Sequence, residues 1–189
     1  MYRTTITRVI QVLVLIGVIV LALKPATATV LDNNNGPELP AGCENLTVDE
    51  GNRLAFHVYA KGSQVYRWNG TSWDFVAPVA TLYAEQNYFG EVGTHYVGPH
   101  WESKSGSKVK AVRIQGKGCS PDQNAIPWII LQSTETSGPG ILKGVTLIQR
   151  TNTTGGNAPA EIGITVGEMK EVPYTAEYYF YKAENPNSN

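Results

Sequence analysis

Apolar and aromatic residues in this chain occur in short runs separated by clusters of Gly, Pro, Asn and Ser. No stretch keeps the 3.6-residue apolar period of an amphipathic helix for three turns. β-Branched and aromatic runs at regular spacing predict an all-β domain, either an antiparallel β-sandwich or a barrel-like sheet. The predicted strands are 54–60, 64–68, 71–75, 88–97, 107–115, 125–132, 141–150 and 172–182. Ala80 to Gln86 is the exception, where the sequence predicts a turn or two of helix.

Two runs indicate where the core lies. Ile126 to Leu131 is the most hydrophobic run, and Pro127, which cannot donate a ladder hydrogen bond, is expected at a strand start, bulge or edge. In 172–182, alternation separates two sets of side chains onto opposite faces. One face carries Tyr174, Ala176, Tyr178 and Phe180, and the other carries Thr175, Glu177, Tyr179 and Tyr181.

A β-hairpin is predicted around Asn69-Gly70, a pair that readily forms a type I′ turn. A two-residue loop sets the cross-strand partners as Trp68 with Thr71, Tyr66 with Trp73, and Gln64 with Phe75. Arg67 and Asp74 then lie diagonally on the other face, close enough for an ion pair. The aromatic face is either core or an exposed platform that stacks on a sugar ring.

The first 28 residues have the layout of a secretory signal peptide. Arg3 and Arg8 precede an apolar run over 9–23, and Ala26-Thr27-Ala28 supplies small residues for cleavage after Ala28. The alternative is an uncleaved anchor, although the run is shorter than the roughly 20 residues of a membrane-spanning helix. The remaining chain divides into an extended lead-in (29–49), a β domain (50–183) and a frayed tail (184–189). We expect a secreted or periplasmic protein with no permanent membrane span after cleavage.

Composition narrows the classes further. The chain has 189 residues, 16% of them charged, and a formal net charge of −1 at pH 7. This length suits one domain, and the slightly acidic balance argues against a nucleic-acid partner. In an oxidising compartment Cys43 and Cys119 most simply pair with each other, the alternative being two buried free thiols.

Candidate chemistry is densest in the polar and aromatic segment 93–102. His95, His100 and Glu102 could converge there, and His57 is the other histidine of the chain, so these three imidazoles are weak candidates for a metal site. Their spacing matches no diagnostic metal motif, and no cofactor is predicted. The alternative is that His95 braces the turn by a hydrogen bond while His100 is exposed.

Two further side chains have candidate roles in catalysis or binding. Glu102 follows Trp101 directly, and partial burial there would raise its pKa and suit a general acid, which needs a partner carboxyl. Arg150 ends a strand beside the flexible Gly155-Gly156 loop, where it could grip an anionic ligand or bridge loops through carbonyls.

Several blocks, in order, resemble an uncharacterised exported family, DUF3455. The blocks are 64–66, Trp73, 78–82, 93–102 with Gly106-Ser107, 126–128, 145–150 leading into 154–159, and 173–181. The resemblance implies a single exported domain and carries no assigned activity. His100 stands where the family prefers a small hydroxyl residue, so it is not expected to be an essential ligand. The family often has a cysteine where this chain has Ile162-Gly163-Ile164.

The sequence therefore favours a noncatalytic exported module that binds a glycan or another cell-envelope ligand. Its predicted ligand-binding residues are His95, Trp101, Glu102, Arg150 and Trp73. One alternative is a secreted hydrolase, metal-dependent or carboxylate-based, that uses the His95–Glu102 segment. The other is a structural or stress-related surface protein.

Overall fold

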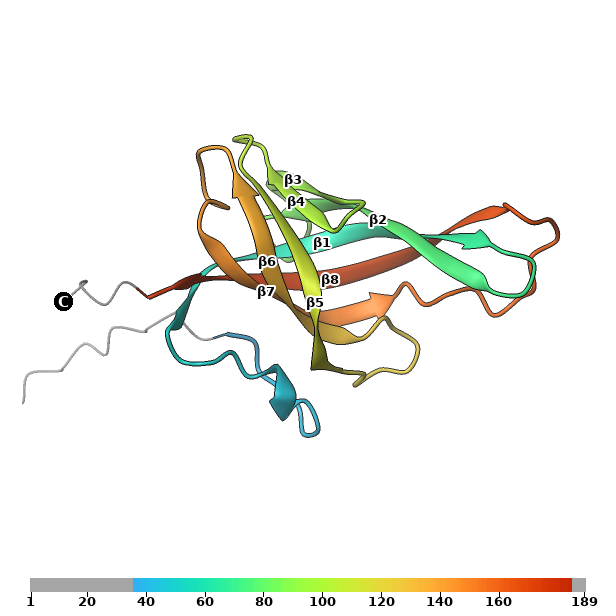
Figure 1. Ribbon diagram of the computed structural model, residues 1–189, viewed down its shortest axis with the longest axis horizontal. Helices are drawn as coiled ribbons and strands as arrows, with labels where there is room; N and C mark the ends of the chain where they lie inside the picture. The colour runs from blue at the N-terminus through green and yellow to red at the C-terminus, as the bar shows by residue number, and fades with distance from the viewer. Residues whose placement is uncertain (1–35, 185–189) are drawn as a thin grey trace, which may run out of the picture. The chain divides into compact units, whose positions relative to one another are not determined.

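Alternating apolar positions build an antiparallel sheet that closes on itself. The computed structural model describes residues 36–184, and in that range each strand pairs with the next while the last returns to the first (Figure 1). The strands are β1 (Asn52–Trp68), β2 (Trp73–Tyr83), β3 (Glu91–Tyr96), β4 (His100–Ser103), β5 (Lys108–Cys119), β6 (Trp128–Ser137), β7 (Val145–Gly155) and β8 (Met169–Ala183). The all-β prediction is confirmed, in its barrel-like form. The predicted signal peptide lies outside the described residues, as do 29–35 and 185–189.

The ring of strands is uneven. β1 and β8 pair along almost their whole length, from Asn52 opposite Ala183 to Arg67 opposite Met169. β4 has only four residues, so its ladders with β3 and β5 are short. Figure 1 shows the β2–β1–β8 part of the sheet continuing beyond the other strands. One end of the ring is therefore bordered by a projecting three-stranded ladder.

The main core fills the inside of the ring. As predicted, alternation on β8 places Tyr174, Ala176, Tyr178 and Phe180 on one face, and in the structure that face points inward. The Trp101 ring from β4 packs edge-on against Tyr178, with ring centroids 5.4 Å apart, and against Phe180 at 6.2 Å. Trp101, Tyr178 and Phe180 are at most 1% exposed, so these large aromatic side chains form the centre of the interior.

A second core lies outside the ring, under the lead-in segment. Its buried members are Cys43, Leu46, Trp128, Ile130, Leu147 and Tyr181. The lead-in, predicted to be extended, contains a short 3-10 helix, η1 (Glu44–Leu46), that covers the outer face of β6 and β7. The first four residues of β6, Trp128 to Leu131, are thus buried on both faces, which explains the continuous apolar run there. It begins directly after Pro127, one of the positions predicted for that proline.

A disulfide between Cys43 and Cys119 ties the lead-in to the end of β5, which confirms the predicted pairing. A disulfide bond is typical of oxidising, extracytoplasmic compartments.

The buried side chain of Gln149 holds the lead-in at the same place. It donates to the Leu46 carbonyl at 2.9 Å and accepts from the Tyr181 hydroxyl at 2.8 Å.

The predicted hairpin forms, but its register was wrong. Trp68 pairs with Trp73, Arg67 with Asp74 and Tyr66 with Phe75, two positions from the predicted partners. The reason is the Asn69 side chain, whose oxygen accepts from the backbone N–H groups of the two residues before Trp73 and so shifts the turn by one residue. Because the pairing moves by two positions, the aromatic residues still share one face.

The predicted helix at Ala80–Gln86 was also wrong. Ala80 and Leu82 point into the core, and they pair with His95 and Gly93 of β3 within the β2–β3 ladder. Two ladders and a buried alternating face outweigh the weak local preference of this segment for helix. β4 is not among the predicted strands, because it is short and follows the polar and aromatic segment's Gly98-Pro99 directly.

Candidate functional site

A cavity of about 700 Å³ opens at the end of the ring where β1 and β2 project. We call it the polar cavity. Its lining combines apolar walls with a few polar side chains, a composition typical of small-molecule sites. The lining residues are Gln64, Tyr66, Phe75, Val76, Pro78, His95, Val97, Gly98, Pro99, Trp101, Arg113, Ile126, Pro127, Ile129, Leu131, Arg150 and Tyr178.

Arg150 supplies a positive charge to this cavity. It lies on β7 opposite Tyr178 of β8, and its Nε and Nη2 donate to the Pro127 carbonyl at 3.2 and 2.8 Å. Burial raises the pKa values of Tyr66 and Tyr178, and the charge of Arg150 opposes that rise. Burial lowers the pKa of His95, and the same charge lowers it further. All three side chains therefore lie near Arg150. Within residues 36–184, no carboxylate forms an ion pair with Arg150.

His95 and Trp101 form the opposite wall as a stacked pair. β3 and β4 place them directly opposite each other, with ring centroids 4.2 Å apart and an 11° angle between the planes. Burial lowers the pKa of His95 to about 3, so the imidazole is neutral at ordinary pH. Its Nδ1 lies 2.8 Å from the His100 carbonyl, which can only accept, so Nδ1 carries the proton and Nε2 is left as an acceptor. The bracing role predicted for His95 is what the geometry shows.

Two buried polar atoms of this cavity's lining have no hydrogen-bond partner: Gln64 Nε2 and Trp101 Nε1. Their side chains are 3% and 1% exposed. Tyr66, by contrast, donates its hydroxyl to the Gly156 carbonyl at 2.6 Å. Leaving such groups unpaired costs roughly 1–3 kcal/mol each, which makes them strong candidates for contacts with a ligand.

Gly156 allows this arrangement of buried side chains. It has a φ of +79°, and an added Cβ would lie 2.8 Å from the Tyr174 Cβ and 3.1 Å from the Gln64 Cγ. The close approach of this backbone to the cavity wall therefore requires glycine.

Of the five predicted binding residues, the structure brings His95, Trp101 and Arg150 together around the polar cavity. Glu102 is not among its lining residues, because alternation on β4 directs Trp101 inward and Glu102 outward. There Glu102 accepts from Tyr96 at 2.9 Å and lies 3.1 Å from the Lys108 Nζ. These two partners lower its pKa, Lys108 having the larger effect, so the predicted raised pKa was wrong.

Trp73 does not line the cavity either. Its indole donates to the Glu161 carbonyl at 2.8 Å, and its ring lies 5.5 Å from the Trp68 ring. It is a member of the aromatic band at the tip of the β1–β2 hairpin.

The three histidines do not converge. His57 stacks on Tyr179 on the outer face of the sheet, with its Nε2 2.9 Å from Glu177, whereas His95 points inward. His100 is partly buried, and its Nδ1 lies 2.7 Å from the Val97 carbonyl. In the described part of the chain, no group of three His, Cys, Asp or Glu side chains is arranged to hold a metal ion.

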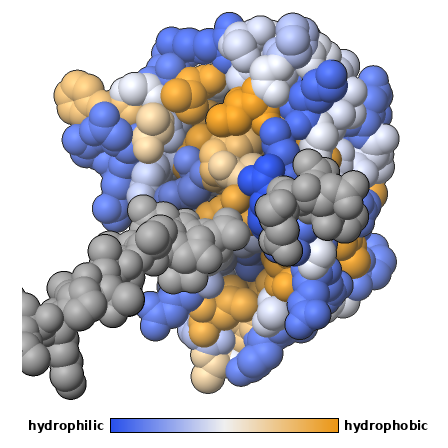
Figure 2. Space-filling model, turned by 90° about the vertical axis from the view of Figure 1, so that its left-hand side faces the viewer, coloured by the Kyte–Doolittle hydropathy of each residue, from blue (hydrophilic) through white to orange (hydrophobic). Residues whose placement is uncertain are grey.

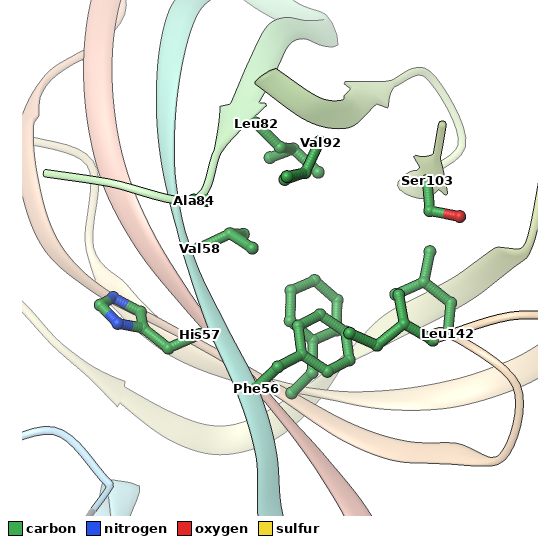
Figure 3. Close-up of a pocket in the computed structure, with 10 residues that line it drawn as sticks. Phe56, His57, Val58, Leu82, Ala84, Val92, Ser103 and Leu142 are labelled. Atoms are coloured by element: carbon green, nitrogen blue, oxygen red, sulfur yellow. The ribbon is translucent and has the colours of Figure 1, made fainter. Parts of the chain in front are cut away.

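A smaller, apolar pocket of about 180 Å³ lies at the opposite end of the ring. Figure 3 shows Phe56, Val58, Leu82, Val92 and Leu142 around it, with His57 directed to the other side of β1. Figure 2 shows the side of the molecule that lies at the left of Figure 1, and there hydrophobic surface lies between hydrophilic borders. This pocket offers few polar contacts, so it is the less specific of the two sites.

Sequence reasoning missed Gln64 and Tyr178 as site residues. The sequence places both on aromatic strand faces, and the available signal is a polar group at an inward position. This signal could not be interpreted from the sequence, because the sequence does not show that the closed sheet leaves a cavity beside Gln64 and Tyr178.

Comparisons with known proteins give one match. The family model described as "Protein of unknown function (DUF3455)" matches residues 49–182. No curated protein and no solved structure matches the chain. Among the helices of residues 36–184, none has the length and apolar character needed to cross a membrane.

Proposed function

Because this chain belongs to the DUF3455 family, which is described as of unknown function, we propose a function from its own cavity. The protein is a noncatalytic, exported binding protein that holds one small molecule in the polar cavity. The observation that carries this proposal is the pair of unpartnered buried donors, Gln64 Nε2 and Trp101 Nε1, at a cavity of about 700 Å³.

The size and walls of the cavity support a small-molecule ligand. Pockets that bind small molecules typically enclose about 300–1,000 Å³ and combine apolar walls with a few polar groups. The interior of an eight-stranded closed sheet is either filled by side chains or holds one small ligand, and this one leaves a cavity. The walls include Phe75, Ile126 and Leu131, which favour a ligand with an apolar body.

A glycan stacked on an open aromatic surface has less support. Trp101, the residue predicted to stack on it, is 1% exposed and already packed against His95 and Tyr178. Its indole edge, rather than its face, offers a free hydrogen-bonding group. The cavity therefore favours a ligand enclosed by the sheet over a sugar lying on the surface.

Export is supported by the disulfide between Cys43 and Cys119 together with the signal-peptide pattern of residues 1–28. The ligand is then a molecule that the protein meets outside the cytoplasm.

The test blocks the mouth of the cavity. Val76 lines the cavity, is 40% exposed, and is the residue left unpaired by the register shift between β1 and β2. Val76→Trp has room to be accommodated and would fill the entrance. Val79→Trp is the matched control, because Val79 lies on the same strand, is 56% exposed and is not a lining residue.

The probe is N-phenyl-1-naphthylamine, an uncharged dye that fluoresces in apolar sites. We expect saturable binding to the wild type and to Val79→Trp, and at least tenfold weaker binding to Val76→Trp. Absence of binding to the wild type would overturn the proposal. A signal that survives Val76→Trp would also overturn it, since the dye would then be located elsewhere, for example in the apolar pocket.

A further inference from the structure

We infer that the polar cavity selects an amphipathic organic anion, whose single acidic head group lies against Arg150 and whose apolar body lies along β6. This inference rests on the proposed function and adds the chemical class of the ligand. It depends on the charge, the donors and the walls of the cavity.

The first observation is a cation without a counter-ion. Arg150 is partly buried, and within residues 36–184 no carboxylate lies within ion-pair distance of it. Buried charges in proteins are normally paired, because removing a charge from water is costly. Nε and Nη2 donate to the Pro127 carbonyl, which fixes the guanidinium plane, and Arg150 also lies against the Tyr178 hydroxyl; further N–H groups of its five are left for a ligand. A fixed guanidinium with free donors matches the geometry of an acidic oxygen pair.

The second observation is that the unpartnered nitrogen atoms of the lining are donors. Gln64 Nε2 and Trp101 Nε1 can only donate, whereas the free acceptor on the wall is the neutral His95 Nε2. Tyr178, whose hydroxyl can also donate, lies directly across the β7–β8 ladder from Arg150. An oxygen head group can accept from these donors, whereas a cationic head group would leave them unpaired.

The third observation concerns the rest of the lining. Arg113 of β5, an exposed residue, also lines the cavity and adds a second positive charge at its edge. Among the described residues that line the cavity, none is Asp or Glu. The remaining wall on β6 consists of Ile129 and Leu131. Positive charge beside an apolar wall is complementary to an anion with a hydrophobic body.

The experiment compares two ligands of nearly equal shape, 1-naphthoate, which carries a carboxylate, and 1-naphthamide, which is neutral. Their affinities are measured by isothermal titration calorimetry at pH 7 on the wild type, which requires no variant to fold. We expect naphthoate to bind at least tenfold more tightly than naphthamide.

Arg150→Gln then removes the charge but keeps a donor toward Pro127. It should reduce the preference for naphthoate to about twofold or less, while naphthamide binding changes little. Arg67→Gln is the matched control, because Arg67 is exposed on β1 and does not line the cavity, so it should retain the wild-type preference. Thermal unfolding of each variant checks that it is folded.

The outcomes separate the two proposals. Equal binding of naphthoate and naphthamide to the wild type would overturn the anionic class but leave the cavity as a binding site. A preference that Arg67→Gln abolishes as fully as Arg150→Gln would show a general charge effect and would also overturn this inference. If the neutral dye binds and is displaced by neither compound, the anionic class falls while the proposed function stands.

Discussion

Acidification should destabilise this protein through His95, a histidine that folding keeps neutral. Burial lowers the pKa of His95 to about 3, and the side chain is 3% exposed. In the unfolded chain the imidazole takes up a proton below about pH 6.5. The unfolded state therefore binds more protons than the folded state between these two values, so the free energy of unfolding falls as the pH falls through this window.

The size of the effect follows from the displaced pKa. Each pH unit within the window costs about 1.4 kcal/mol, because one proton is bound by the unfolded state and excluded by the folded state. Lowering the pH from 6.5 to 4 should remove about 3 kcal/mol through this one residue. That is a large share of the roughly 5–15 kcal/mol by which domains are normally stable.

The assay is urea unfolding at pH 7 and at pH 4 for the wild type and His95→Asn, which keeps a side-chain donor for the His100 carbonyl but cannot titrate. The variant should lose about 3 kcal/mol less than the wild type between the two pH values. Trp101→Phe is the control, because it alters the same stacked pair without removing a titrating group, and it should keep the wild-type loss. An equal loss in the wild type and His95→Asn would refute the reasoning.

Three further predictions concern the frame around the site. Replacing both Cys43 and Cys119 with Ser opens a link across a sequence separation of 76 residues, and should lower the free energy of unfolding by about 4 kcal/mol in chemical denaturation at pH 7. An unchanged denaturation midpoint would mean that the lead-in is held without the disulfide. Gly62→Ala places a Cβ against the Val79 carbonyl and the Ala80 backbone, and should cost about 2 kcal/mol or more in thermal unfolding, a loss that a wild-type melting temperature would contradict. Glu102→Gln removes only the outward ion pair with Lys108, so both the melting temperature and dye binding should stay close to wild type. Loss of dye binding would instead show that Glu102 contributes to the binding site.

The faces of the strands could be predicted because burial is recorded locally in the sequence. Alternation separated Tyr178 from Tyr179, and the unbroken apolar run of β6 reflected burial on both faces. The register of the β1–β2 hairpin could not be predicted in this way, because the Asn69 side chain decides it through hydrogen bonds within the turn. Closure of the sheet depends on β8 finding β1 across most of the chain, which local pattern does not specify.

In the candidate site, too, some residues could be predicted from the sequence and others could not. Arg150, His95 and Trp101 were predicted from residue type and position near turns, and they line one cavity. Glu102 was included because it follows Trp101 in sequence, but neighbours on a strand point to opposite faces. Gln64 was missed, because its role depends on the cavity beside it.

The most direct test of the central claim observes the cavity itself. In ¹⁵N-labelled protein, the indole N–H resonances of the four tryptophans report on each ring separately. Addition of 1-naphthoate should shift the Trp101 resonance, whose N–H has no partner in the described structure, and leave that of Trp73, which donates to the Glu161 carbonyl, nearly unchanged. A titration in which Trp101 does not move, or moves no more than Trp73, would contradict the account.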